Sequence, residues 1–290
     1  MSSPLSSSSS TSASSHHYVE SDFPILRQSG RILAGTLTTC TNTNTSSGAA
    51  QAVVLLLHGL ASHKDHNFAP ALAHTLSMNA GLNVLRFNFR SAPPSPLEPL
   101  HRFRICGADD DVDDVSAVLA ALALRNMYVI TLIGHSRGAA VALLSATRLL
   151  PSLSKIQNLV LLAPRWEAVA MLDGPFFQRE DIAALESGEK NHFVWMTRAG
   201  EVTVTRDDIK TLVDAGTMEA PLAALASNVK VLIIHGDADR IIPLSSAYAF
   251  HTSRPEIVRV VVISGASHNF ETKSHADELI NAAVNFLAPK

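Results

Sequence analysis

The stretch TLIGHSRGAA, residues 131–140, places Ser136 between two glycines at the end of an apolar run. The run before the serine predicts a strand at 128–133. The residues at 139–150 are apolar almost all round, which predicts a buried helix. A serine on such a sharp strand-to-helix turn projects its hydroxyl beyond the sheet. The glycines are needed because a Cβ at either position would collide across the turn. Ser136 is therefore a candidate nucleophile.

Short β-branched or leucine-rich runs recur on both sides of this stretch, each with the length of a strand buried on both faces. They lie at 53–57, 84–89, 128–133, 159–163, 231–235 and 258–263. Helical patterns lie between them, such as the apolar stripe of 112–124. Strands that alternate with helices predict an α/β fold with a doubly wound, mostly parallel sheet. Residues 25–38 predict an antiparallel hairpin at the edge of that sheet.

The alternation stops between about 165 and 221. A connection of this length is usually functional or disordered, and its aromatic content argues against disorder. We predict a cap over 165–221, inserted after the sixth strand. Its aromatic residues are expected to line a substrate pocket, with anchoring of the cap to the sheet as the alternative role. These residues are Trp166, Phe176, Phe177, Phe193 and Trp195.

The composition limits the class of protein. The chain has 290 residues, of which 47% are hydrophobic, enough for one large α/β domain. A formal net charge of −3 gives no reason to expect a nucleic acid or an acidic membrane as a partner. No apolar run has the length of a membrane span. Cys40 and Cys106 show neither metal spacing nor a disulfide framework, which indicates a reducing compartment.

The N-terminal segment MSSPLSSSSSTSASS is of low complexity. It lacks the basic start and the apolar core of a secretory signal. We predict a disordered serine-rich tail over 1–19 and a folded domain over 20–290. A cytoplasmic location follows from this interpretation. The absence of acidic residues leaves an organelle-targeting segment as the alternative.

A serine hydroxyl needs a base to take its proton, and the base needs an orienting acid. The predicted strands at 231–235 and 258–263 are followed by GDADRIIP and SGASHNF. These segments place Asp239 and His268 a few residues beyond the strand ends. The order Ser136, Asp239, His268 is the order in which α/β hydrolases carry nucleophile, acid and base. The sequence therefore predicts a catalytic triad of these three residues.

Two neighbouring residues remain as alternatives. Asp237 lies only two residues beyond the strand end and competes with Asp239 for the role of acid. His275 is a weaker candidate for the base, because SHADELI is typical of a helix start with Ser274 as the N-cap.

Two backbone N–H groups are needed to stabilise an oxyanion. One is expected from Arg137, the residue after the nucleophile. The other is expected from Leu60, in the segment HGLASHKD that follows the strand at 53–57, where Gly59 allows a sharp turn. His58 is expected to hold this loop by a side-chain hydrogen bond.

The motifs HGLASHKD, LRFNFR, GHSRG, HGDADRIIP and GASHNF resemble, in order and spacing, those of the α/β-hydrolase superfamily over about residues 50–288. More narrowly, the chain resembles the fungal intracellular esterase-like branch, often labelled ectomycorrhiza-regulated esterase. It is more distantly similar to feruloyl and cinnamoyl esterases and to serine aminopeptidases. The resemblance implies an α/β-hydrolase fold and the same triad.

The chain departs from that branch beside the expected site. It reads RSAPPSPLEPL where the branch has a glycine-rich turn, and it has Asn88 where the branch usually has aspartate. Substrate preference is therefore not carried over from the resemblance.

No metal or cofactor is expected. The acidic segment ADDDVDD, residues 108–114, lacks the ligand spacing and glycine of a calcium loop and fits a helix start. His58, His63 and His66 lie on the loop already assigned to the oxyanion. The sequence has no glycine-rich phosphate loop or dinucleotide fingerprint.

These features predict a serine hydrolase that cleaves a small-molecule carboxylic ester through an acyl-enzyme. Thioesterase, amidase or aminopeptidase activity is the near alternative, because the same triad serves these reactions. A non-catalytic ligand-binding protein of the same fold is the alternative of another class. The oligomeric state is left open.

Overall fold

The computed structural model describes residues 17–41, 49–90, 108–149, 152–172, 175–197, 200–214 and 216–288. Most of the expected serine-rich tail, Cys106 and nearly all of the RSAPPSPLEPL segment lie outside the described residues. No helix in the described part of the chain is long and apolar enough to cross a membrane.

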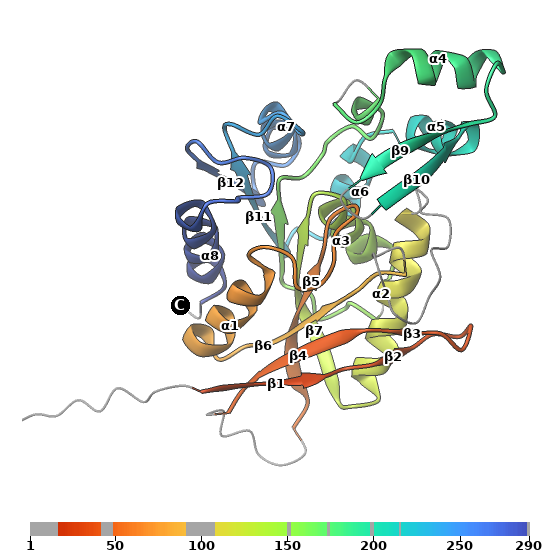
Figure 1. The fold of residues 1–290 in the computed structure, drawn as a ribbon. Coiled ribbons are helices and arrows are strands. Elements are labelled where there is room, and N and C mark those ends of the chain that lie inside the picture. The colour runs from red at the N-terminus through yellow and green to blue at the C-terminus, as the bar shows by residue number, and fades with distance from the viewer. Residues whose placement is uncertain are drawn as a thin grey trace, which may run out of the picture.

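An eight-stranded sheet with the order β1-β4-β6-β5-β7-β8-β11-β12 forms the centre of the fold (Figure 1). Its six parallel strands confirm the six predicted runs, with ends shifted by at most two residues. They are β5 (Gln51–Leu57), β6 (Asn83–Phe87), β7 (Met127–His135), β8 (Asn158–Leu162), β11 (Lys230–Gly236) and β12 (Val258–Ile263). Five of these strands are buried along most of their length and are mainly apolar without alternation. The sixth, β12, lies at the edge of the sheet and exposes Arg259, Val261 and Val262.

Helices form a layer on each face of the sheet (Figure 1). One apolar cluster contains the buried residues of α1 (Ala69–Ala80) and α8 (Lys273–Leu287). The larger cluster on the other face contains those of α2 (Ala108–Ala123), α3 (Arg137–Arg148) and α7 (Ser245–Ser253). The predicted doubly wound α/β architecture is therefore confirmed.

The N-terminal edge differs from the expectation. Tyr18 and Val19, which were expected in the tail, belong to β1 (Tyr18–Asp22), an antiparallel partner of β4 (Gly35–Cys40). The predicted hairpin at 25–38 is divided, because only the two-residue strands β2 (Ile25–Leu26) and β3 (Ile32–Leu33) pair with each other. All five residues of β1 are exposed, so this strand carries no apolar pattern that sequence reasoning could detect.

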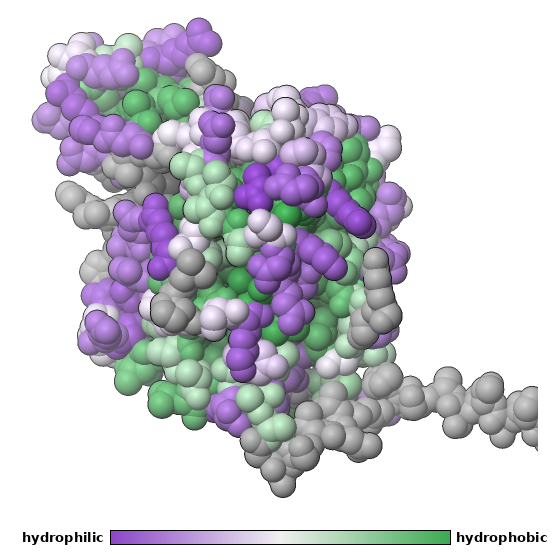
Figure 2. Space-filling view, turned by 180° about the vertical axis from the view of Figure 1, so that it is seen from behind, coloured by the Kyte–Doolittle hydropathy of each residue, from purple (hydrophilic) through white to green (hydrophobic). Residues whose placement is uncertain are grey.

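A separate lobe lies between β8 and β11, after the sixth strand of the central sheet. It contains η1 (Val169–Met171), α4 (Arg179–Ser187), the hairpin β9 (His192–Thr197)–β10 (Gly200–Thr205), α5 (Arg206–Asp214) and α6 (Glu219–Ala224). Phe177, Leu185 and Phe193 belong to an apolar cluster internal to this lobe. In Figure 2 the lobe projects from the upper corner of the body, with apolar residues visible between polar ones. We refer to this lobe as the cap.

The starts of two helices can be compared with the sequence. Helix α3 begins at Arg137, directly after the serine, where the buried helix was expected to begin. Helix α8 begins at Lys273 with Thr272 as its N-cap, because the Thr272 side chain accepts a hydrogen bond from the N–H of His275. The expectation of Ser274 as the cap is therefore wrong.

Candidate active site

Ser136 lies on a strained turn between β7 and α3. Its backbone has φ 53° and ψ −115°, in a region that residues with a side chain rarely adopt. A Cβ on Gly134 would lie 2.1 Å from the carbonyl oxygen of Gly138, and a Cβ on Gly138 would lie 2.3 Å from that of Leu57. Both contacts are far too short for carbon and oxygen. The predicted need for glycine on each side of Ser136 is confirmed.

Asp239 lies on the turn after β11, with its side chain fully buried. One carboxylate oxygen, Oδ1, accepts hydrogen bonds from the N–H groups of Ile241 (2.8 Å) and Ile242 (2.9 Å). The other oxygen, Oδ2, accepts a hydrogen bond of 2.7 Å from Nδ1 of His268. The carboxylate is thereby fixed in orientation and holds the imidazole of His268 by its Nδ1–H.

A second imidazole supports the same carboxylate. His235 is completely buried at the end of β11, and its Nε2 lies 3.3 Å from Oδ2 of Asp239 and 3.0 Å from the carbonyl oxygen of Ile242. Burial raises the pKa of Asp239, but the hydrogen bonds from His235 and His268 outweigh this effect and hold the pKa well below its usual range. Asp239 is therefore ionised near neutral pH.

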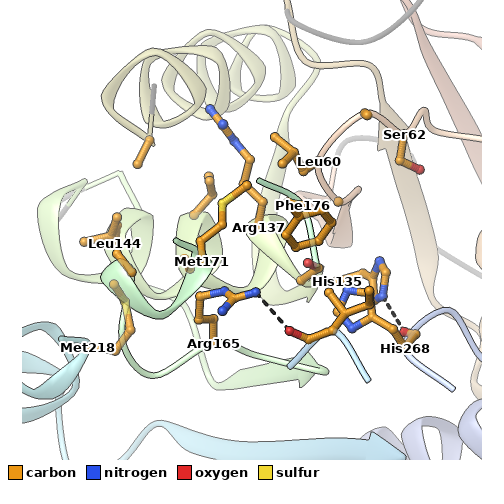
Figure 3. A pocket seen from close by; sticks show the side chains of 18 of the residues that line it. Leu60, Ser62, His135, Arg137, Leu144, Arg165, Met171, Phe176, Met218 and His268 are labelled. Carbon is orange, nitrogen blue, oxygen red and sulfur yellow. Dashed lines mark hydrogen bonds between the residues drawn. The ribbon is translucent and has the colours of Figure 1, made fainter. Parts of the chain in front are cut away.

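His268 follows β12 and is held from its backbone as well as from its ring. Nε2 of His135 donates a hydrogen bond of 2.9 Å to the His268 carbonyl (Figure 3). Burial lowers the pKa of His135 to about 3, so this ring stays neutral. With Nδ1 bonded to Asp239, the second ring nitrogen of His268 is left to face the pocket. Ser136 and His268 make no hydrogen bond to each other, which is common in sites without substrate.

The two alternatives raised by the sequence lie elsewhere. Asp237 accepts hydrogen bonds from the N–H of Gly265 (2.6 Å) and the hydroxyl of Ser264 (3.2 Å), so it ties together the turns after β11 and β12. His275 lies in the first turn of α8. Neither residue lines the pocket that contains Ser136 and His268.

The loop after β5 packs directly against the nucleophile turn. A Cβ on Gly59 would lie 3.0 Å from Nδ1 of His135 and 3.4 Å from Cβ of Ser136, so a larger residue would crowd both side chains. Nδ1 of His58 donates to the carbonyl of Gly59 (2.8 Å), and its Nε2 accepts from the N–H of Phe89 (3.1 Å). Burial lowers the pKa of His58 to about 4. The predicted structural role of His58 is confirmed.

Leu60 lies in the loop after β5 and Arg137 directly follows Ser136, and both residues line the pocket. The N–H of Leu60 makes no hydrogen bond to a described residue, and that of Arg137 belongs to the first residue of α3. Such an N-terminal N–H group is directed away from the helix, where it favours negative charge. The placement of both residues is compatible with the expected oxyanion hole, which stays a prediction.

Arginines partner the acidic residues at the start of α2. Nε of Arg137 lies 2.5 Å from Oδ2 of buried Asp111, and Asp114 pairs with Arg90 at 2.9 Å. Among the described residues, no group of three or more histidine, cysteine, aspartate or glutamate side chains is arranged to hold a metal ion. The segment fixes helix α2 and the residue after the nucleophile.

Asn88, which stands where the sequence comparison expected an aspartate, has a structural role as well. Its Oδ1 accepts a hydrogen bond of 2.7 Å from the N–H of Lys64, in the HGLASHKD loop. An asparagine oxygen accepts this bond as an aspartate would, so the exchange leaves the loop anchored.

A cavity of about 1480 Å³ contains Ser136 and His268 in its wall and lies between the sheet and the cap. It extends along α3, where Ala140, Val141 and Leu144 form part of an apolar floor. Figure 3 shows Arg137, Arg165 and Phe176 around the same space. A site of this kind, mainly apolar with a few polar groups, is typical of small-molecule binding.

The five cap aromatics divide into two groups. Phe176 and Trp195 line the cavity, with ring centroids 5.4 Å apart. Phe177 and Phe193 are buried in the cap's own cluster, and Trp166 packs edge-on against Phe250 of α7 at 4.8 Å. The expectation that all five line the pocket is therefore corrected to two. The physical reason is that a small lobe must bury large side chains of its own to be stable.

Sequence reasoning missed three residues of the site: His135, His235 and Arg165. The two histidines lie inside strands, and no sequence pattern distinguishes them from other buried residues. Arg165 could have been found, because it follows β8 and the carboxyl ends of parallel strands are where ligand sites gather.

Solved structures with this fold include several esterases. Est1E from Butyrivibrio proteoclasticus, in a structure with bound ferulic acid, superposes with a TM-score of 0.68 at 19% identity, over 91% of this chain and 97% of that one. The esterase domain of a Rhodothermus marinus protein gives 0.63 at 16% identity, over 93% and 97%. The Pyrococcus furiosus esterase Pf2001 gives 0.61 at 16% identity, over 93% and 90%. These likenesses show a shared fold.

No curated protein sequence matches the chain. A family model described as "Alpha/beta hydrolase family" matches residues 54–282, which covers the sheet from β5 onward, the cap and most of α8. The chain belongs to the alpha/beta hydrolase family.

Proposed function

We propose that this hydrolase cleaves carboxylic esters through an acyl-enzyme on Ser136. The Ser136 hydroxyl attacks the ester carbonyl while His268 takes its proton. His268 then returns the proton to the leaving alcohol, and water cleaves the acyl-enzyme by the same steps. Asp239 keeps the imidazole in the tautomer that accepts at Nε2. The N–H groups of Leu60 and Arg137 stabilise the tetrahedral oxyanion.

One observation carries this proposal. A fully buried carboxylate lies 2.7 Å from Nδ1 of His268, whose ring borders the same cavity as a serine held at φ 53°. A strained backbone beside a fixed acid–imidazole pair is costly for folding, so it persists where a function needs it. The esterase neighbours support esters over other carbonyl substrates.

Labelling and turnover test the proposal together. A fluorophosphonate probe should attach to Ser136, as found by mass spectrometry of the labelled peptide, and the purified protein should release p-nitrophenol from acyl esters. Hydrolysis of anilides or thioesters in preference to esters would move the assignment to amidase or thioesterase. Binding of esters with neither labelling nor turnover would indicate a non-catalytic ligand-binding protein.

The proposal includes two narrower expectations, which are membership of a fungal esterase-like branch and a cytoplasmic location. The motif resemblance supports the fungal intracellular esterase-like branch, and the intracellular location of that branch supports a cytoplasmic site. The location is tested by expressing the full chain with a C-terminal fluorescent tag, since an organelle pattern would favour a targeting role for the N-terminus.

The rate should depend on pH through the base. Imidazoles ordinarily titrate near pH 6.5, and a base must be neutral to accept the serine proton. Asp239, His58 and His135 all have lowered pKa values, so none of them changes charge near neutrality. We expect kcat/KM to rise through one protonation step between about pH 6 and 8. A pH titration with and without EDTA checks this, because loss on chelation that zinc restores would indicate a metal site.

The two tryptophans of the chain should behave differently. Trp195 lines the cavity, so Trp195→Ala should shift the preference between short and bulky acyl esters by about tenfold or more. Trp166 packs on Phe250, so Trp166→Ala should lower the melting temperature by several degrees and leave the preference unchanged. The ratio of kcat/KM across an ester panel and a thermal melt measure the two effects. A changed ester preference in Trp166→Ala, with an unchanged preference in Trp195→Ala, would contradict this assignment of the pocket.

A further inference from the structure

Arg165 occupies a central place at the site that the proposed mechanism does not use. It follows β8, whose Leu162 pairs in register with His135 and accepts a hydrogen bond from the N–H of Ser136. On its other side β8 pairs with β11, which leads to Asp239. The guanidinium lies in the cavity wall beside His135 and His268 (Figure 3). Arg165 therefore stands between the nucleophile turn and the acid turn.

The other arginines and acidic residues that are described in the cavity wall are neutralised by partners. Arg137 pairs with Asp111 at 2.5 Å, and Arg148 pairs with Asp109 at 2.5 Å. Asp214 forms an ion pair with Lys210. Each of these pairs presents little net charge to a ligand.

Arg165 has no such partner in the described part of the chain. Its one hydrogen bond runs from a terminal nitrogen to the carbonyl oxygen of Ile241, at 3.3 Å, and it forms no ion pair with a described residue. A guanidinium carries five N–H donors in a planar fork, so most of its donor capacity remains unused. Burial lowers the pKa of Arg165, and the negative charge of Asp239 offsets this only in part. A half-buried cation without a carboxylate destabilises the free protein and is suited to an anion that arrives with the substrate.

We propose that Arg165 is a specificity residue that binds a carboxylate carried by the ester substrate. This proposal rests on the proposed esterase function and names its substrate class: small esters with an anionic group near the scissile bond. Asp239 does not compete for the guanidinium, because its two oxygens are already bonded to two backbone N–H groups and two imidazoles. The planar fork of arginine matches a carboxylate by two parallel hydrogen bonds.

Matched substrates test the proposal on the wild-type protein. On the acyl side, p-nitrophenyl hydrogen glutarate is compared with p-nitrophenyl pentanoate. On the alcohol side, 4-acetoxybenzoate is compared with 4-acetoxybenzamide. We expect the anionic member of at least one pair to have the higher kcat/KM, by about tenfold or more. A preference for the neutral member in both pairs would overturn the proposal.

Variants then separate recognition from packing. Arg165→Met should reduce the anionic-to-neutral ratio by about ten- to hundredfold, the effect of losing a charged hydrogen-bond partner, and Arg165→Lys should retain part of it. Arg148→Met is the matched control, since it removes a paired arginine from the same cavity and should keep the ratio. An equal loss on anionic and neutral esters in Arg165→Met would show a structural role and overturn the proposal.

A binding measurement separates this inference from the proposed function. Calorimetry with Ser136→Ala needs no turnover, and we expect monomethyl glutarate to bind at least tenfold more tightly than the uncharged methyl pentanoate and to lose this advantage when Arg165→Met is added. Equal binding of the two esters would refute the anion site even if ester hydrolysis is confirmed. Selective binding of monomethyl glutarate would support the site even if Ser136 is not the nucleophile.

Discussion

Replacing Ser136 by alanine is expected to lower the turnover of an activated ester by roughly four to six orders of magnitude. The change removes the one oxygen that can form the acyl-enzyme and leaves the oxyanion donors in place. Residual activity above the uncatalysed rate would come from those donors and from substrate binding. Stopped and continuous assays with p-nitrophenyl esters, on protein purified to exclude traces of host esterase, measure the loss.

The fold should not change in this variant. Alanine has the same Cβ as serine, so the backbone at φ 53° carries a comparable strain in both, and no hydrogen bond of the side chain is lost. Ser62→Ala is the matched control, because Ser62 is a second serine in the wall of the same cavity. We expect the control to keep activity within about threefold of wild type. A Ser136→Ala protein that retains a tenth of the wild-type rate would exclude Ser136 as the nucleophile.

Asp239→Asn is expected to remove most activity, by roughly 10⁴ in kcat as in other triads of this chemistry. An amide in this position presents an N–H to Nδ1 of His268, which stabilises the tautomer that cannot accept the serine proton. Asp237→Asn is the matched control. Asp237 bonds the turn at Ser264 and Gly265 rather than an imidazole, so it should lose no more than about threefold in rate. The opposite ranking of the two variants would move the acid to Asp237.

The same variant has a stability signature. The pKa of Asp239 is held below its ordinary value, so its ionised form stabilises the folded state at every pH above the ordinary carboxyl pKa. This contribution is lost as the pH falls through the lowered pKa, below the ordinary value near 4. Asp239→Asn should therefore melt below wild type at pH 7, and the gap should narrow in acid. A gap that stays constant down to the lowest pH at which the protein folds would contradict the assigned charge.

The six parallel strands were predictable from the sequence because five of them are buried along most of their length and the sixth, β12, is rich in valine. A parallel strand covered on both faces must be apolar at nearly every position, and this leaves a continuous run that single-sequence reasoning recognises. The exposed strand β1 left no such mark, and its pairing through Tyr18 and Val19 became visible only from the fold. The cap was predictable as an interruption, but its internal packing was not.

The sequence by itself determined the turn at Ser136, because the collisions that demand glycine at 134 and 138 are local and involve a few residues of backbone. It also determined the candidate acid and base, which follow recognisable strands. Only the tertiary structure decided how the charges pair: His235 and His268 both reach Asp239, Asp111 meets Arg137 from another helix, and Arg165 meets no carboxylate of the described residues. Only the tertiary structure shows that Trp195 lines the pocket whereas Trp166 packs against Phe250. The physical reason is distance along the chain, since these contacts join residues that are brought together by the folding of the whole sheet, and no local pattern records them.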